Sequence, residues 1–250
     1  MFYGIPKGRE KEMQQAMATI EDIYKGRVYY SDMLMTVGRN LSFRHDQKFM
    51  SCFYDAVTNN QELSLLWRVH ILAWAAKNAL NVEGDFVECG VLKGFCSGVL
   101  LDYLGFQDIS RQAYLYDTFE GLPEKTSTAK ERGDWNYTKF DPEAIYNGVR
   151  EKFSKYKNVN IVRGIVPDSF AEAVPEKIAF LHIDMNSVQA EMLALEHLFD
   201  KVTPGGFIVF DDFGWGSNIN QMSAELAFMN ARNHYVMELP TGQGVVMKHA

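Results

Sequence analysis

Residues 180 to 215, FLHIDMNSVQAEMLALEHLFDKVTPGGFIVFDDFGW, give the clearest indication of the fold. One apolar run ends at Asp184, and a second ends at Asp211 and Asp212. Between the two runs, apolar residues recur at helical spacing, and Pro204-Gly205-Gly206 marks a sharp turn before the second run. The stretch therefore predicts a strand, a helix and a second strand.

The three aspartates are candidates for a metal site. In an open parallel sheet, such a unit places the carboxyl ends of both strands at one edge, where ligands bind. Asp184, Asp211 and Asp212 would then meet there, and their oxygens suit Mg²⁺ or Ca²⁺. Any one of them taken alone is equally well explained as turn chemistry. The three together favour a metal site.

The remaining chain extends this unit into a larger sheet. From Gly84 onward, short apolar strands alternate with helices, which predicts a doubly wound, mostly parallel α/β sheet. A helix around residues 221–230 precedes two terminal strands at 234–240 and 242–249. The connection between these strands is so short that they must form an antiparallel hairpin.

The N-terminal third has a different pattern. Residues 10–80 indicate mainly helix, with a less regular stretch at 28–46. We expect residues 1–80 to form a helical segment that covers the site as a lid or makes a subunit contact, and residues 81–250 to form the sheet domain. The irregular stretch contributes side chains either to an apolar pocket or simply to the core: Tyr29, Tyr30, Met33, Met35 and Phe43.

Composition excludes several classes of function. A chain of 250 residues with 47% hydrophobic residues can bury a full core. Its net charge of −7 argues against a nucleic-acid partner, which leaves small molecules. Its three cysteines are too few and too poorly spaced for a disulfide framework or a zinc site. No apolar run reaches membrane-spanning length and no apolar signal follows Met1, so we expect a cytoplasmic location.

A second candidate site follows the first strand of the sheet. Glu88 ends this strand, and Gly90, Gly94 and Gly98 follow where the chain turns into a helix. Glycines allow close approach of the backbone to a ligand and expose helix N-terminal amides. The spacing is neither the dinucleotide fingerprint nor a phosphate loop. An acidic residue at this point suits the positive amino group of S-adenosylmethionine (SAM), although Glu88 is also explained as a helix cap.

Asp117 ends the next strand, where a carboxylate accepts hydrogen bonds from ribose hydroxyls. The alternative is that it starts the turn at residues 121–123. The surface loop at residues 124–143 is rich in charge and turn formers and is placed to close over a ligand. Gln221 and the segment 241–244 are further candidates for facing the pocket.

At these motifs the sequence resembles the macrocin O-methyltransferase family (TylF type), which uses SAM and Mg²⁺ to methylate sugar hydroxyls of natural products. GDFVECGVLKG (84–94) and YDTFEGLP (116–123) resemble its cofactor motifs, and IDMN (183–186) with GGFIVFDD (205–212) its metal motif. The resemblance implies a Rossmann-like, seven-stranded class I methyltransferase fold, a homo-oligomer, and Mg²⁺ held by Asp184, Asp211 and Asp212. It also implies a set of residues around the cofactor: Glu88, Cys89, Gly90, Val91, Gly94, Ser97, Asp117, Thr118, Phe119, Arg163 and Gly164.

One position departs from the family pattern. The family has a second aspartate two residues after the first, where this chain has Asn186, which cannot take a proton at neutral pH. Asp184 or His182 could serve as the base instead, with the metal lowering the pKa of the hydroxyl. Alternatively, the acceptor is intrinsically acidic. His182 is more readily explained as a hydrogen-bonded core histidine.

The sequence therefore predicts a SAM-dependent and Mg²⁺-dependent O-methyltransferase that acts on a hydroxyl of a small molecule, a sugar or a natural-product scaffold. Asn186 motivates one alternative, a SAM-binding protein with impaired catalysis. A metal-dependent nucleotide-sugar enzyme that uses the aspartates is the other.

Overall fold

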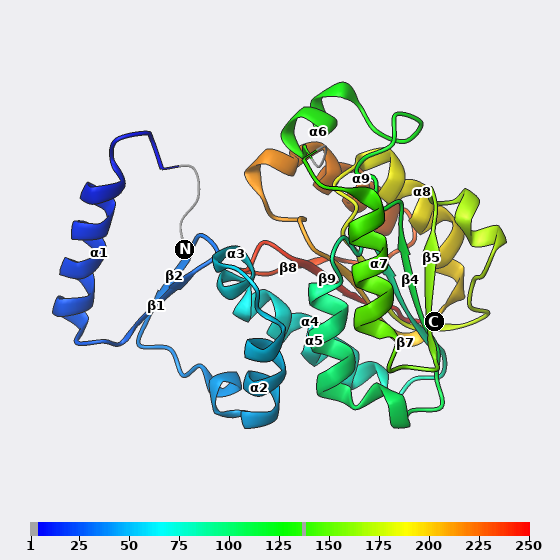
Figure 1. Cartoon of the computed structure of the whole chain (residues 1–250), viewed down its shortest axis with the longest axis horizontal. Helices are drawn as coiled ribbons and strands as arrows, with labels where there is room; N and C mark the ends of the chain where they lie inside the picture. The colour runs from blue at the N-terminus through cyan, green and yellow to red at the C-terminus, as the bar shows by residue number, and fades with distance from the viewer. Residues whose placement is uncertain (1–4, 137–138) are drawn as a thin grey trace. The chain divides into compact units, whose positions relative to one another are not determined.

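The computed structural model describes residues 5–136 and 139–250, and the chain divides into two compact units, Met1–His70 and Ile71–Ala250 (Figure 1). The larger unit contains a seven-stranded sheet with the order β5-β4-β3-β6-β7-β9-β8. Its strands are β3 (Asp85–Cys89), β4 (Ala113–Asp117), β5 (Val159–Arg163), β6 (Ile178–Ile183), β7 (Val202–Phe210), β8 (Met237–Glu238) and β9 (Gly244–Met247).

The sheet has the predicted topology. Strands β3 to β7 pair in parallel, whereas β9 is antiparallel to both β7 and β8. The strand order reverses between β3 and β6, because the chain runs outward from β3 to β5 and then returns to β6. Ligands of such folds bind at the carboxyl ends of the strands beside this switch point. The predicted doubly wound sheet with a terminal antiparallel hairpin is confirmed.

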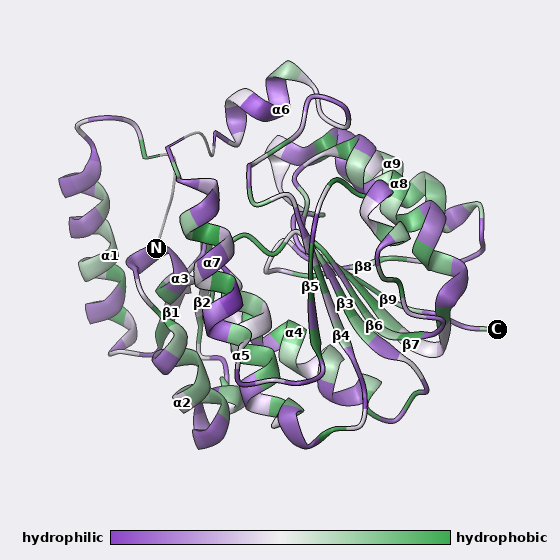
Figure 2. Ribbon diagram, turned by 45° about the vertical axis from the view of Figure 1, so that its right-hand side comes forward, coloured by the Kyte–Doolittle hydropathy of each residue, from purple (hydrophilic) through white to green (hydrophobic). Residues whose placement is uncertain are grey.

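Burial explains why the central strands have nearly continuous apolar sequences. Every residue of β6 is buried, as expected for a parallel strand covered on both faces. Figure 2 shows helices on both sides of the sheet and the most hydrophobic residues concentrated in its central strands. The main covering helices are α5 (Phe95–Leu104) and α7 (Pro142–Phe153) on one face, and α8 (Val188–Leu198) and α9 (Ile219–Asn230) on the other.

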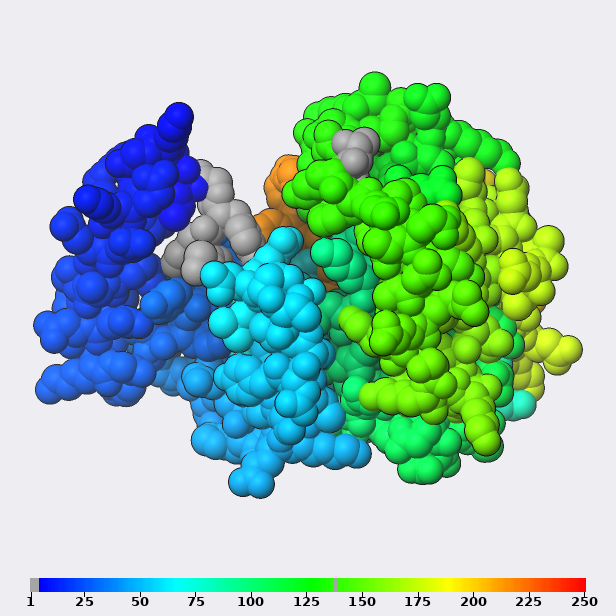
Figure 3. All heavy atoms as spheres, in the orientation of Figure 1, coloured from blue at the N-terminus to red at the C-terminus, as the bar shows by residue number. Residues whose placement is uncertain are grey.

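The predicted surface loop at 124–143 is partly helical. It contains α6 (Ala129–Asp134) and the beginning of α7, while residues 137–138 lie outside the described part of the chain. In the space-filling view, α6 and α7 belong to the outer surface of the larger unit (Figure 3). Short 3-10 helices occur at Ser42–His45, Phe106–Asp108, Asp168–Ala171, Phe199–Lys201 and Gly216–Asn218.

The smaller unit contains a hairpin that the sequence did not predict. Strands β1 (Val28–Ser31) and β2 (Leu34–Val37) pair antiparallel, and Asp32 and Met33 between them both have positive φ angles. A buried ion pair between Arg68 Nε and Asp32 Oδ2, 3.0 Å long, holds this turn. The helices of the N-terminal region are α1 (Glu10–Tyr24), α2 (Gln47–Ala56), α3 (Asn60–Ser64) and α4 (Leu66–Ala79), of which α4 continues into the larger unit.

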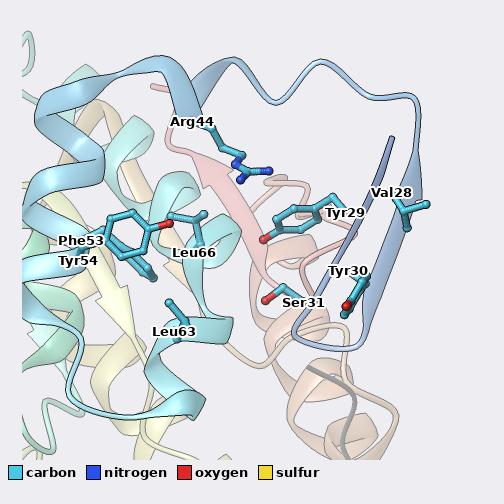
Figure 4. A pocket seen from close by; sticks show the side chains of 9 residues that line it. All are labelled: Val28, Tyr29, Tyr30, Ser31, Arg44, Phe53, Tyr54, Leu63 and Leu66. Carbon is cyan, nitrogen blue, oxygen red and sulfur yellow. The ribbon is translucent and has the colours of Figure 1, made fainter. Parts of the chain in front are cut away.

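The smaller unit also has a shallow cavity of about 240 Å³, shown in Figure 4. Tyr29 and Tyr30 line it, whereas Phe43 is buried and Met33 and Met35 are exposed. Of the two alternatives for the irregular stretch, pocket lining applies to Tyr29 and Tyr30 and core to Phe43, whereas the exposed Met33 and Met35 fit neither. The cavity is lined by Val28, Tyr29, Tyr30, Ser31, Arg44, Phe53, Tyr54, Leu63 and Leu66. Among residues 5–136 and 139–250, no helix has the length and apolarity needed to cross a membrane.

Candidate active site

A row of charged side chains crosses three neighbouring strands at the carboxyl edge of the sheet. Glu88 of β3 is paired in register with His182 of β6, and Asp211 directly follows β7. His182 Nδ1 lies 2.9 Å from Glu88 Oε1, and its Nε2 lies 3.6 Å from Asp211 Oδ1. The imidazole is fully buried, so the structure supports the prediction of a hydrogen-bonded core histidine.

The two carboxylates determine the protonation state of His182. Burial lowers the pKa of this imidazole, but the interactions with Asp211 and Glu88 raise it more, and the pKa reaches about 10. An imidazolium is a donor at both nitrogens and has no lone pair for a proton or a metal ion. His182 is therefore better suited to orienting Glu88 and Asp211 than to acting as the base.

Two of the three predicted metal ligands lie together. The ligand atoms of Asp184, Asp211 and His182 lie within 4.8 Å of one another, in a group that does not include Asp212. His182 is held between Glu88 and Asp211, so the donors best placed for a cation are the carboxylates of Asp184 and Asp211. Such oxygen donors fit Mg²⁺, which is bound by one or two carboxylates and retains several positions for water or substrate.

The hairpin at the end of the chain supports Asp211. Gln243 is fully buried, and its Nε2 donates a hydrogen bond of 3.0 Å to Asp211 Oδ1. Thr241 Oγ1 in turn donates to Gln243 Oε1 at 3.0 Å. The segment 241–244 was predicted to face the pocket, and Gln243 lies directly behind one of its carboxylates. Gln221, the other candidate of this kind, is buried on α9.

Asp117 organises the loop after β3. Its Oδ2 accepts hydrogen bonds from the backbone amides of Val91 and Leu92, both at 2.7 Å, and its Oδ1 accepts one from Phe119 at 2.6 Å. Burial raises the pKa of Asp117, and these three hydrogen bonds oppose the rise. A carboxylate has about four acceptor positions, so about one remains for a ribose hydroxyl. Asp117 therefore shapes the loop in addition to its predicted contact with the cofactor.

Contacts within the chain explain why this loop needs glycine at two positions. A Cβ atom on Gly90, which has φ +95°, would lie 1.8 Å from the carbonyl oxygen of Asp184. One on Gly94, which has φ +66°, would lie 2.7 Å from Cε2 of Phe153. The sequence suggested close approach to a ligand, whereas the structure shows close approach to the chain itself. The loop after β3 and the loop after β6 are therefore in direct contact.

The remaining residues predicted beside the cofactor lie around these loops. Ser97 Oγ donates to Glu88 Oε2, and Cys89 and Val91 are buried. Burial also raises the pKa of the Cys89 thiol, so this group stays protonated. Thr118 Oγ1 donates to the carbonyl oxygen of Gly121 at 2.7 Å. Glu88 thus has protein partners at both oxygens, and its contact with a cofactor stays a prediction.

An aromatic corner lies beside Asp117. The rings of Phe119 and Tyr146 have centroids 5.1 Å apart, and the guanidinium carbon of Arg163 lies 5.0 Å from the Tyr146 centroid. Arg163 also pairs with two glutamates, Glu120 at 2.9 Å and Glu143 at 2.6 Å. The amide of Gly164 donates to the carbonyl oxygen of Asp117 at 2.9 Å. The structure thus brings the predicted adenine region, residues 163–164, next to Asp117.

A buried pair of glutamates was not predicted. Glu191 of α8 and Glu225 of α9 are both fully buried, and Glu191 Oε1 accepts a 3.0 Å hydrogen bond from the amide of Met185. Burial and the charge of Glu225 raise the pKa of Glu191 well above its usual value, and burial raises that of Glu225 to about 7. The pair therefore retains a proton near neutral pH. No motif marks either residue in the sequence.

This pair predicts a pH dependence of stability. Because the folded protein binds a proton more tightly at Glu225 than the unfolded chain does, stability is lost as pH rises from about 4.5 to about 7. Glu225→Gln should flatten this part of the profile, with a difference on the order of 1 kcal/mol per pKa unit. Thermal unfolding at a series of pH values measures it. Parallel profiles for the two proteins would contradict the shared proton.

The comparisons with known proteins agree with this geometry. The family model of macrocin O-methyltransferase (TylF) matches residues 68–236. The 8-demethyl-8-(2,3-dimethoxy-alpha-L-rhamnosyl)-tetracenomycin-C 4'-O-methyltransferase of Streptomyces olivaceus is 27% identical over 210 residues, which cover 75% of this chain and 80% of the relative. The mycinamicin III 3''-O-methyltransferase of Micromonospora griseorubida is 28% identical over 163 residues, which cover 58% and 62%.

Solved structures show the same fold. The O-methyltransferase NovP superimposes with a TM-score of 0.63 at 19% identity, covering 74% of this chain and 81% of NovP. CalS11, a calicheamicin methyltransferase, gives a TM-score of 0.62 at 15% identity, with coverage of 98% and 94%. The family match spans more than half of the chain. The chain therefore belongs to the macrocin O-methyltransferase (TylF) family, and it is a SAM-dependent O-methyltransferase.

Proposed function

We propose that the protein methylates a sugar hydroxyl of a natural product, with Mg²⁺ bound by Asp184 and Asp211. The observation that carries this proposal is the convergence of these two carboxylates at the carboxyl edge of the sheet, in contact with the loop after β3. One curated relative is named for 4'-O-methylation of a rhamnosyl-tetracenomycin, and another for 3''-O-methylation of mycinamicin III. Asp212 stays a predicted ligand.

Different residues would have different roles in methyl transfer. Asp117 and the loop that it shapes would hold the ribose of SAM, and Phe119 with Tyr146 would flank its adenine. Mg²⁺, when bound, supplies a Lewis acid that lowers the pKa of a hydroxyl. Gln243 and His182 orient Asp211, and Asp184 offers a partly exposed carboxylate that can accept the proton of the hydroxyl.

Asn186 lies beside Asp184. It adopts the left-handed region with φ +54°, which Asn tolerates better than most residues. Its Oδ1 is buried and has no hydrogen-bond partner in the described part of the chain, and its Nδ2 donates to Asp184 Oδ1 at 3.4 Å. An amide oxygen accepts a hydrogen bond from a hydroxyl but cannot remove its proton. Asn186 is therefore unable to serve as the base, and Asp184 is the carboxylate that would take the proton.

A carboxylate at position 186 should increase the rate. In Asn186→Asp, the neighbouring Asp184 would raise the pKa of the new carboxyl and make it a better base. We expect kcat on an aliphatic hydroxyl to rise roughly tenfold or more. The assay is methyl transfer across a pH series, with Asn186→Gly as a control that keeps the backbone conformation. An unchanged kcat would mean that Asn186 does not occupy the position of the base.

The first test measures cofactor binding and methyl transfer on the same protein. Calorimetry should show binding of S-adenosylhomocysteine (SAH), and an acceptor panel of rhamnosides should show turnover that EDTA removes and Mg²⁺ restores. Turnover that resists EDTA would overturn the metal assignment. SAH binding without turnover on any hydroxylated acceptor would favour a SAM-binding protein with impaired catalysis, the alternative that Asn186 motivates. The family match does not favour a nucleotide-sugar enzyme.

A further inference from the structure

We propose that Glu131 is a positioning residue for this reaction, because it joins the surface segment 123–136 to the loop 184–188. The proposal rests on the proposed function, since that loop carries both Asp184 and Asn186. Glu131 belongs to α6 and accepts a hydrogen bond from the backbone amide of Val188, at the end of that loop. Its effect on Asp184 and Asn186 would be transmitted through the backbone of the loop.

The backbone of the loop 184–188 is held from three sides. The amide of Asp184 donates to the carbonyl oxygen of Cys89 at 2.8 Å, which ties the loop to the sheet. The amide of Met185 donates to Glu191 Oε1 at 3.0 Å, which ties it to α8. The amide of Val188 donates to Glu131 Oε1 at 2.9 Å. Of these three backbone contacts, the third comes from the surface segment 123–136.

The N-terminus of helix α8, which directly follows the loop, is capped by the surface segment. Its N-cap residue, Ser187, makes no side-chain capping bond, because its hydroxyl donates to the carbonyl oxygen of Thr126 instead. Both Ser187 and Thr126 are buried, at 1% exposure each. The carboxylate of Glu131 takes over the capping of Val188, where the helix dipole also favours a negative charge.

The two oxygens of the Glu131 carboxylate bind different segments. Oε2 accepts hydrogen bonds from the amide and the hydroxyl of Thr128, at 2.6 Å and 2.8 Å, and completes the capping box of α6. Oε1 is left for Val188 of α8. Burial raises the pKa of Glu131, but the hydrogen bonds from Thr128 and Val188 outweigh it and lower the pKa overall. The bridge is therefore a charged one at neutral pH.

Loss of the bond between Glu131 and Val188 should affect the loop 184–188 more strongly than the cofactor site. Asn186 has a left-handed backbone, which Asn tolerates and which the contacts of the loop hold in place. Without the bond to Val188, the loop keeps its contacts with Cys89, Glu191 and Thr126 but loses the one that α6 supplies at the start of α8. Asp184 would then be less well placed for a cation, whereas the Asp117 contacts that shape the cofactor loop remain.

The test uses Mn²⁺ as the metal probe and compares Glu131→Ala, Glu131→Gln and Thr128→Ala. We expect Glu131→Ala to weaken Mn²⁺ binding roughly tenfold, to speed amide exchange at residues 184–188, and to lower kcat more than the KM for SAM. Glu131→Gln should restore part of each loss, because its amide oxygen can still accept from Val188. Thr128→Ala removes a partner of α6 but leaves Oε1 in place, so it should retain wild-type Mn²⁺ affinity.

The outcomes separate this proposal from the proposed function. Wild-type Mn²⁺ affinity and wild-type exchange rates in folded Glu131→Ala would overturn it. Equal losses in Glu131→Ala and Thr128→Ala would also overturn it, because they would reflect the stability of α6 alone. If the wild type binds neither SAH nor Mn²⁺, the proposed function fails. Exchange at residues 184–188 then decides for or against the bridge.

Discussion

Asp184→Ala should abolish methyl transfer, with a loss in kcat/KM of at least about 10³-fold. Asp184 is both a carboxylate available to Mg²⁺ and the most exposed acceptor for the proton of the substrate. Its removal should also eliminate calorimetric binding of Mg²⁺. The affinity for SAH should stay within about threefold, because the hydrogen bonds of Asp117 to Val91 and Leu92 are unaffected.

Two further variants make this result specific. Asp168→Ala removes an exposed carboxylate paired with Lys125, and it should leave methyl transfer and Mg²⁺ binding unchanged. Asp212→Ala tests the third predicted ligand. A loss of Mg²⁺ binding as severe as that of Asp184→Ala would show that Asp212 also binds the metal. Full activity of Asp184→Ala would refute the proposed role of Asp184 at the site.

The second large effect is expected at Gly90. In Gly90→Ala, the new Cβ would lie 1.8 Å from the carbonyl oxygen of Asp184, so one of the two loops must move. The alanine would also have to adopt φ +95°, which L-residues rarely do. We expect the variant to bind SAH at least about 100-fold more weakly and also to lose affinity for Mg²⁺. Calorimetry with each ligand measures the two losses separately.

Gly98 provides the matched control. It lies in helix α5, and a Cβ there would meet only Cδ of Lys152 at 3.6 Å, an ordinary contact. Gly98→Ala should therefore bind both ligands normally and be stabilised by up to about 1 kcal/mol, because alanine favours helix. If Gly90→Ala is folded and loses SAH but keeps full Mg²⁺ affinity, the contact between the loops does not connect the two sites.

Strand periodicity and topology made the sheet and the meeting of Asp184 with Asp211 predictable. Both residues follow parallel strands that are neighbours in the sheet, so their positions depend on few assumptions. Asp212 lies outside the group of ligand atoms formed by His182, Asp184 and Asp211, so its role as a metal ligand stays a prediction.

Other features depended on contacts that no local pattern encodes. The hairpin at Asp32 and Met33 lacks the glycine or asparagine that usually marks such a turn, and a distant residue, Arg68, holds it. The bond from Val188 to Glu131 crosses 57 positions of sequence. In the sequence, Glu131 is one charged residue in a polar segment. Its capping box with Thr128 is a local signal, but its second partner is not.

The buried row of Glu88, His182 and Asp211 has a consequence for the charge balance of the site. The imidazolium of His182 neutralises one of the negative charges of Glu88, Asp184 and Asp211. The net negative charge of these four side chains then equals in size the charge of a divalent cation. A further carboxylate at position 186 would add a negative charge to this group of four residues, whereas the neutral amide of Asn186 adds none. The charge of Asp212, which follows Asp211, comes in addition to that of the group.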